Sequence, residues 1–166
     1  PLLKSPPTNF MALVAEAQTA SFAPLPLLAL LKHPFMALGY DRIKLLHLTR
    51  LLEKSTLRGP RPEHGLKGLL KTLKLQKNNG NLCKLIVDLQ AAFKDFSDLY
   101  GGKTTSFSKL LEAHILLSER LATSPEENGL EILWSKDDGR ALSSLLRELL
   151  DISPTLGPID PGDYPL

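Results

Sequence analysis

The excess of leucine over β-branched aliphatic residues is the feature that most constrains the fold of this chain. The 166 residues include 38 Leu but only 6 Ile and 2 Val. Leucine keeps most of its rotamer freedom in a helix, whereas Ile and Val lose χ1 freedom there and are favoured in strands. A β-sandwich or a parallel sheet would therefore lack side chains for its core. The composition predicts an all-α protein, and the length is that of one domain.

Proline and glycine residues mark the boundaries of the expected helices. Between them, apolar residues recur every three or four positions, which predicts about seven helices in a single domain over residues 1–153. Residues 154–166 contain four Pro and two Gly, so we expect an extended Pro-rich tail or linker there. The helices are expected over residues 6–19, 27–32, 65–77 and 107–121, with a long one that begins at Leu82, keeps one apolar face through Phe96 and ends at Gly101-Gly102. A short helix is expected over 130–134, another begins after Asp41 as its N-cap, and a last one begins at Asp137 or Asp138.

Residues that carry out covalent or metal chemistry are few and scattered. Cys83 adjoins the apolar face of the long helix that begins at Leu82, so we expect a partly buried, inert thiol. His114 lies between apolar positions of its own helix, and we expect it in or beside the core rather than as a metal ligand. Residues 102–104 read Gly-Lys-Thr, but Ser97 stands where a P-loop requires its first glycine. The sequence therefore predicts a chain with no cofactor of its own and no recognisable catalytic motif.

Charge is balanced over the whole chain but unevenly placed along it. Between Lys54 and Lys84 there are eight basic residues and one Glu, a local net charge of +7. From Glu126 onward, nine acidic residues accompany three basic ones, a local net charge of −6. A basic strip attracts phosphate through counterion release, whereas the alternative interpretation is a solvated surface without a ligand. The residues that we expect to follow a phosphate backbone are Arg58, Arg61, Lys67, Lys71 and Lys74.

The sequence contains no signal for a membrane or for export. Its apolar runs stay below the roughly 18 residues that a membrane span requires. No basic region followed by an apolar stretch opens the chain, as it would in a signal peptide. We therefore expect a cytoplasmic location and no membrane partner. Because the chain begins with Pro rather than Met, we also expect it to be either a trimmed chain or an internal piece of a longer protein.

Three parts of the sequence are more distinctive than a generic amphipathic helix. They are residues 22–34 (FAPLPLLALLKHP), residues 57–62 (LRGPRP) with 65–69 (GLKGL), and residues 156–165 (LGPIDPGDYP). In this order and spacing they resemble an interior stretch of AddB, a double-strand-break repair subunit of the alphaproteobacterial type. Residues 6–10 and the pair Leu133-Trp134, followed by Gly139, fit the same stretch, while residues 75–130 correspond to it only as helix.

The resemblance implies a role inside a larger enzyme. AddB pairs with a helicase and nuclease subunit, AddA, in an ATP-dependent helicase–nuclease that resects broken DNA ends for homologous recombination. By its position, this chain is similar to the helical insertion of the second helicase-like lobe, which is called 2B in related helicases. The helicase, nuclease and cluster-cysteine motifs of the family do not occur in these 166 residues, so no catalytic residue carries over.

Two functions are therefore open at this point. In the first, a non-catalytic helical domain positions DNA or the neighbouring lobes, and its partners are an AddA-like subunit, the rest of the parent chain and DNA. In the second, the chain is a protein–protein interaction module without direct DNA contact, and its basic residues are only solvated. An independent small helical enzyme is a third interpretation, which none of its motifs favours.

Overall fold

The computed structural model describes residues 4–57, 64–76 and 78–164. Regular structure in these ranges is helical, apart from one isolated β-bridge between Thr105 and Ile159. The prediction of an all-α protein is therefore confirmed, with eight α-helices in the described ranges where about seven were expected. The helices are α1 (Pro6–Thr19), α2 (Pro24–Lys32), α3 (Arg42–Leu52), α4 (Gly65–Leu75), α5 (Gly80–Tyr100), α6 (Phe107–Ala122), α7 (Gly129–Trp134) and α8 (Asp137–Ile152).

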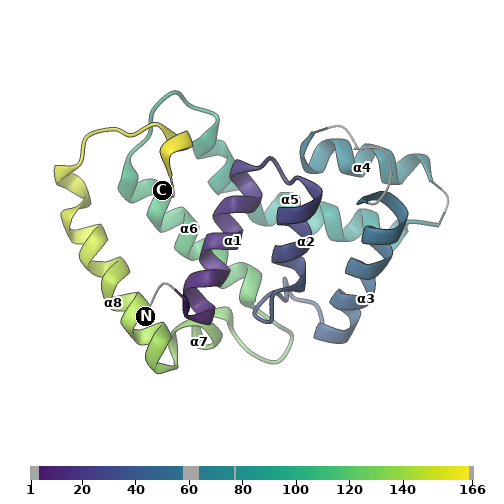
Figure 1. Ribbon diagram of the computed structural model, residues 1–166, viewed down its shortest axis with the longest axis horizontal. Coiled ribbons are helices and arrows are strands. Elements are labelled where there is room, and N and C mark those ends of the chain that lie inside the picture. Colours follow the sequence, from purple (N-terminus) through teal and green to yellow (C-terminus); the bar gives the residue numbers. More distant parts are fainter. Residues whose placement is uncertain (1–3, 58–63, 77, 165–166) are drawn as a thin grey trace.

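The helices form an elongated arrangement with two distinct ends. Figure 1 shows α3 and α4 at one end and α8 at the other, with α1, α2, α5 and α6 between them. A π-helical turn, η2 (Glu53–Leu57), continues α3, and two 3-10 turns, η3 (Ser153–Thr155) and η4 (Pro161–Asp163), follow α8. The long helix α5 packs against α3, α4 and α6 and so connects both ends through one core.

Local sequence signals account for most of the helix boundaries. The carboxylate of Asp41 accepts hydrogen bonds from the backbone N–H groups of Ile43 and Lys44, at 2.9 and 3.1 Å, which confirms it as the N-cap of α3. α5 ends at Tyr100 with Gly101 as its C-cap, which confirms the predicted stop at Gly101-Gly102, and it begins two residues before the predicted start at Leu82. α4 ends at Leu75, ahead of the predicted boundary at residue 77.

The core is built around the apolar face predicted for α5. Leu85, Ile86, Leu89, Phe93 and Phe96 are at most 1% exposed. Burying one such side chain fully stabilises a fold by about 1.5–3 kcal/mol relative to leaving it in water. This face therefore holds α3, α4 and α6 in place and fixes the surfaces that these helices present to solvent.

The Pro-rich C-terminal segment packs back onto the helices. Tyr164 is 6% exposed, and its hydroxyl lies 2.7 Å from Nδ1 of His114. Nε2–H of His114 donates to the carbonyl of Met11 at 2.9 Å, so Nδ1 is the acceptor for the tyrosine hydroxyl. The hydroxyl of Tyr100 donates to the carbonyl of Tyr164 at 3.0 Å. The burial of His114 confirms a core histidine, and Cys83 is partly buried as expected.

Candidate nucleic-acid interface

The predicted basic strip is present as one exposed face of α4. Lys67, Lys71 and Lys74 are spaced four and three residues apart, which at 100° per residue places them within roughly 60° of one another. All three side chains are exposed. The leucines of the opposite face are buried in the core, where α4 packs on α5: Leu66, Leu69 and Leu73. Arg58 and Arg61, the other two expected contacts, lie outside the described residues.

A second basic face, which the sequence analysis missed, runs along α3 and η2. Lys44, His47, Arg50 and Lys54 are all exposed, and their spacing places them within an arc of roughly 120°. The basic stretch of the sequence begins only at Lys54, so Lys44, His47 and Arg50 lie outside it. The signal that would have found them is the spacing of three, three and four residues on one side of an amphipathic helix. The leucines on the other side are buried: Leu45, Leu48 and Leu52.

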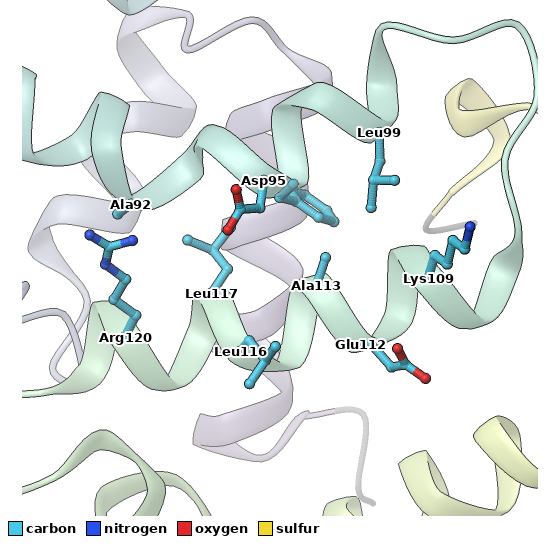
Figure 2. A pocket seen from close by; sticks show the side chains of 10 residues that line it. Ala92, Asp95, Leu99, Lys109, Glu112, Ala113, Leu116, Leu117 and Arg120 are labelled. Carbon is cyan, nitrogen blue, oxygen red and sulfur yellow. The ribbon is translucent and has the colours of Figure 1, made fainter.

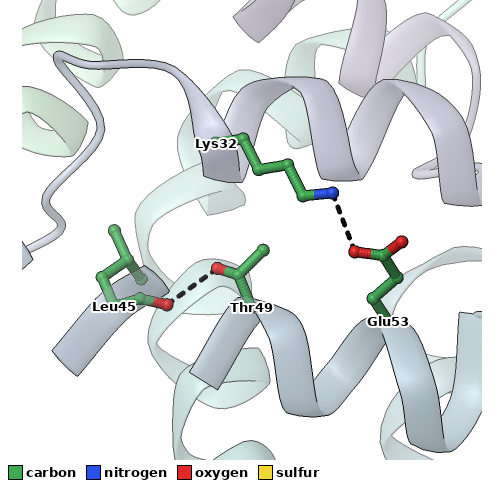
Figure 3. A network of polar contacts seen from close by, with 4 residues as sticks. All are labelled: Lys32, Leu45, Thr49 and Glu53. Carbon is green, nitrogen blue, oxygen red and sulfur yellow. Dashed lines mark hydrogen bonds and ion pairs between the residues drawn. The ribbon is translucent and has the colours of Figure 1, made fainter. Parts of the chain in front are cut away.

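The single acidic residue within α3 and η2 is turned toward another helix. Figure 3 shows Glu53 joined to Lys32 of α2, and the carboxylate oxygen lies 2.7 Å from the lysine Nζ. On the same helix, the buried hydroxyl of Thr49 donates to the carbonyl of Leu45 at 2.8 Å. The negative charge of Glu53 is thus paired on the side facing α2, and the basic face of α3 carries no carboxylate.

One cluster joins this basic face to α5. Lys84 pairs with Asp88 at 2.6 Å, and the hydroxyl of Tyr40 donates to the same carboxylate oxygen. The amino groups of Lys44 and Lys84 each lie 5.6 Å from the centroid of the Tyr40 ring, within cation–π range. The hydrogen bond to Asp88 raises the pKa of Lys84. The charge of Lys84, whose side chain is 67% exposed, is therefore paired with Asp88 at the surface, whereas Lys44 lies at the edge of the exposed basic face.

The basic and the acidic segments of the sequence lie at opposite ends of the folded protein. Among the described residues from 41 to 90, eight Lys and Arg side chains accompany three carboxylates, a net charge of +5. From residue 126 to residue 163, nine carboxylates accompany three basic side chains, a net charge of −6. Figure 1 places α4 and α8, which belong to these two segments, at opposite ends of the long axis. A polyanion is therefore attracted toward the end formed by α3 and α4 and repelled at the other.

The two basic faces meet near η2. The side-chain amide of Gln76, which follows α4, donates to the carbonyl of Ser55 in η2 at 3.4 Å. η2 also packs against α4. We call the exposed basic side chains of both faces the basic end. They are Lys44, His47, Arg50, Lys54, Lys67, Lys71 and Lys74.

A pocket of about 420 Å³ lies between α5 and α6, away from the basic end. Figure 2 shows its apolar floor, with Leu117 and Ala113 of α6 below α5, and a charged rim. Asp95 lies over Leu117, while Glu112 points away from α5, so the two carboxylates are not arranged to act on one substrate atom. The guanidinium of Arg120 donates to the carbonyl of Ala91 at 3.1 Å. This pocket therefore offers no arrangement of facing acid and base groups.

Comparison with known proteins adds no relative: no family model, no curated protein and no solved structure matches this chain. The resemblance to AddB thus rests on the segments quoted above and stays a prediction.

Within residues 4–57, 64–76 and 78–164, no helix is long and apolar enough to cross a membrane. In the same ranges, no three His, Cys, Asp or Glu side chains are grouped so that they could hold a metal ion.

Proposed function

We propose that this chain is a non-catalytic helical domain of an AddB-like subunit, and that its basic end holds the backbone of DNA. The parent complex would be a cytoplasmic, ATP-dependent helicase–nuclease with an AddA-like subunit as partner. The domain would position DNA beside the lobes in which the chemistry takes place. The observation that carries this proposal is the pair of basic faces on α3–η2 and α4, neither of which includes a carboxylate.

The composition of the basic end favours contact with phosphate rather than with bases. Lysine is a compact point charge that neutralises phosphate without reading sequence. Six of the seven side chains are Lys or Arg. If all six met a phosphate, the logarithm of the binding constant would fall with the logarithm of salt concentration with a slope of about −5. A smaller slope would mean that fewer of these six side chains contact a phosphate.

The experiment is a salt titration of DNA binding with charge-reversed variants. Fluorescence anisotropy of a labelled 20-base-pair duplex gives the binding constant between 50 and 300 mM salt. The triple variant Lys67→Glu, Lys71→Glu, Lys74→Glu should bind more weakly, and its salt slope should be smaller by about 3, since each phosphate contact contributes about 0.9.

A matched control distinguishes the effect of the three lysines on α4 from the effect of the total charge. The triple variant Lys103→Glu, Lys109→Glu, Lys136→Glu changes the total charge by the same amount, at exposed positions outside α3 and α4. Its slope should stay within about 0.5 of the wild-type value. An equal loss of slope in both triple variants would show that only overall charge matters and would refute the proposed interface.

A protein–protein role for the same end is the second candidate, because apolar side chains are exposed there. Ile43 of α3 is 79% exposed and Leu75 of α4 is 82% exposed. These side chains suit burial against a neighbouring lobe or an AddA-like subunit. Under this alternative, the 166-residue chain would show no duplex binding at 100 mM salt. An Ile43→Ser, Leu75→Ser variant would then lose association with the partner while its salt slope for DNA stayed at zero.

A further inference from the structure

An apolar cavity lies at the acidic end, away from the basic faces. It has a volume of about 670 Å³ and is lined by residues of α1, α6, α8 and the C-terminal segment over residues 158–164. Its volume falls within the range of about 300–1,000 Å³ that small-molecule sites occupy. The proposed DNA contacts do not use any residue of this cavity.

The floor of the cavity is apolar and already closely packed. Met11, Leu111, Leu142 and Leu146 form one cluster and are each at most 8% exposed. α8 therefore packs directly against α1 and α6 at the floor of the cavity.

The polar groups deep in the cavity are already satisfied. His114 and Tyr164, which line it, are hydrogen-bonded to each other, and the second ring nitrogen of His114 donates to a backbone carbonyl. Among the described residues, no buried side-chain nitrogen or oxygen lacks a partner. A ligand group that enters here gains nothing from carrying polar atoms, because each would be buried without a partner. The inner part of the ligand must therefore be apolar.

The mouth of the cavity carries negative charge. Asp160 and Asp163 line it and are exposed, and one oxygen of Asp160 accepts from the backbone N–H of Gly162 at 2.8 Å. The described lining residues include no Lys or Arg. In the described ranges, neither carboxylate is engaged in a salt bridge. A positively charged head group at the mouth would complement both.

We propose that this cavity binds a small cationic amphiphile, with an apolar chain between α1, α6 and α8 and an ammonium or guanidinium head beside Asp160 and Asp163. The proposal is independent of DNA binding, since the cavity and the basic end share no residue. It assigns a function to the C-terminal segment, which supplies both carboxylates and one wall of the site.

Three amphiphiles with the same ten-carbon chain test the proposal on the 166-residue protein. They are decyltrimethylammonium, decyl sulfate and decyl maltoside, each kept below its micelle concentration. Trp134 is the single tryptophan and packs against the cluster that forms the floor, so its fluorescence reports occupancy. Calorimetry gives the affinities. The cation should bind at least about five-fold more tightly than the sulfate, as expected for one exposed charge contact.

Two variants locate the ligand. Ala12→Phe fills the cavity from an exposed position on α1 and should abolish binding of the cation. Ala141→Phe places the same group on an exposed position of α8 outside the cavity and should leave binding unchanged. The double variant Asp160→Asn, Asp163→Asn keeps an oxygen that can accept from Gly162 and should bind the cation and the maltoside with equal affinity.

Several outcomes would overturn the proposal. Equal affinity of the wild type for all three amphiphiles would refute the cationic head, and binding that survives Ala12→Phe would place the ligand elsewhere. No binding of any amphiphile to protein that is folded by circular dichroism would refute the site. Binding of an amphipathic Leu/Lys helical peptide without binding of the amphiphiles would show instead that the cavity accepts a helix.

Discussion

Lowering the pH from 7.5 to 5 should remove about 2 kcal/mol of folding stability through His114 alone. Burial lowers the pKa of His114 from 6.5 to about 4, although its hydrogen bond to the carbonyl of Met11 favours the protonated ring. The unfolded chain binds this proton below pH 6.5, whereas the folded protein binds it only near pH 4. The stabilisation is therefore complete above pH 6.5 and is lost as the pH falls through 4. One pKa unit corresponds to about 1.4 kcal/mol, so the whole loss amounts to about 3 kcal/mol, of which two-thirds is reached at pH 5.

A glutamine variant isolates this contribution from the other titrating groups. In His114→Gln, the side-chain amide can still donate to Met11, and its oxygen can still accept from the hydroxyl of Tyr164. The carboxylates and the other histidines titrate in both proteins, so their effect cancels in the comparison. Urea unfolding followed by the fluorescence of Trp134 gives the free energy of unfolding at each pH.

The expected result is that the pH change lowers the stability of the wild type more than that of the variant. Between pH 7.5 and pH 5, the unfolding free energy of the wild type should fall by about 2 kcal/mol more than that of His114→Gln. Equal falls in the two proteins would mean that the imidazole is accessible to protons in the folded state. The burial of this ring, and the reasoning built on it, would then be wrong.

Substitutions at three further positions test other parts of the fold by the same unfolding measurement. Tyr164→Phe should cost about 1–3 kcal/mol, because Nδ1 of His114 is left buried without its donor; a cost below 0.5 kcal/mol would contradict the hydrogen bond. Asp41→Ala should cost about 1 kcal/mol through loss of the α3 cap, while Asp41→Asn should be nearly neutral; equal effects would point to charge rather than capping. Gly139→Ala should cost about 1–3 kcal/mol or more, since the new Cβ would collide with the carbonyl of Leu133; an unchanged stability would show that α7 and α8 are not in this contact.

The features that the sequence predicted well depend on neighbours along the chain. The cap at Asp41 needs only the backbone N–H groups two and three residues later. The buried face of α5 follows from an apolar period that the helix repeats every 3.6 residues. The exposure of Lys67, Lys71 and Lys74 follows from the same geometry, because a leucine row on one side of a helix leaves the other side in water.

The features that the sequence did not predict depend on contacts between distant residues. Tyr164 is buried because it meets His114, 50 positions away, and nothing near Tyr164 in the chain signals that contact. The cavity beneath it likewise draws its walls from α1, α6, α8 and the C-terminal segment. The basic face of α3 was missed for a different reason. The net charge of a stretch of sequence does not show which charged side chains lie on the same side of a helix.

The separation of charge along the long axis connects the two proposals. If both proposals hold, a duplex bound at the basic end would be repelled by the net −6 of residues 126–163, so DNA would be held at one end rather than along the whole molecule. The acidic cavity would then face away from the bound DNA and stay open to a cationic ligand. Because the cavity and the basic end share no residues, filling the cavity by Ala12→Phe should leave the salt slope of DNA binding unchanged, as expected for distant, independent sites. A change in that slope would instead mean that α1 and α5 transmit the packing of the cavity to α3 and α4.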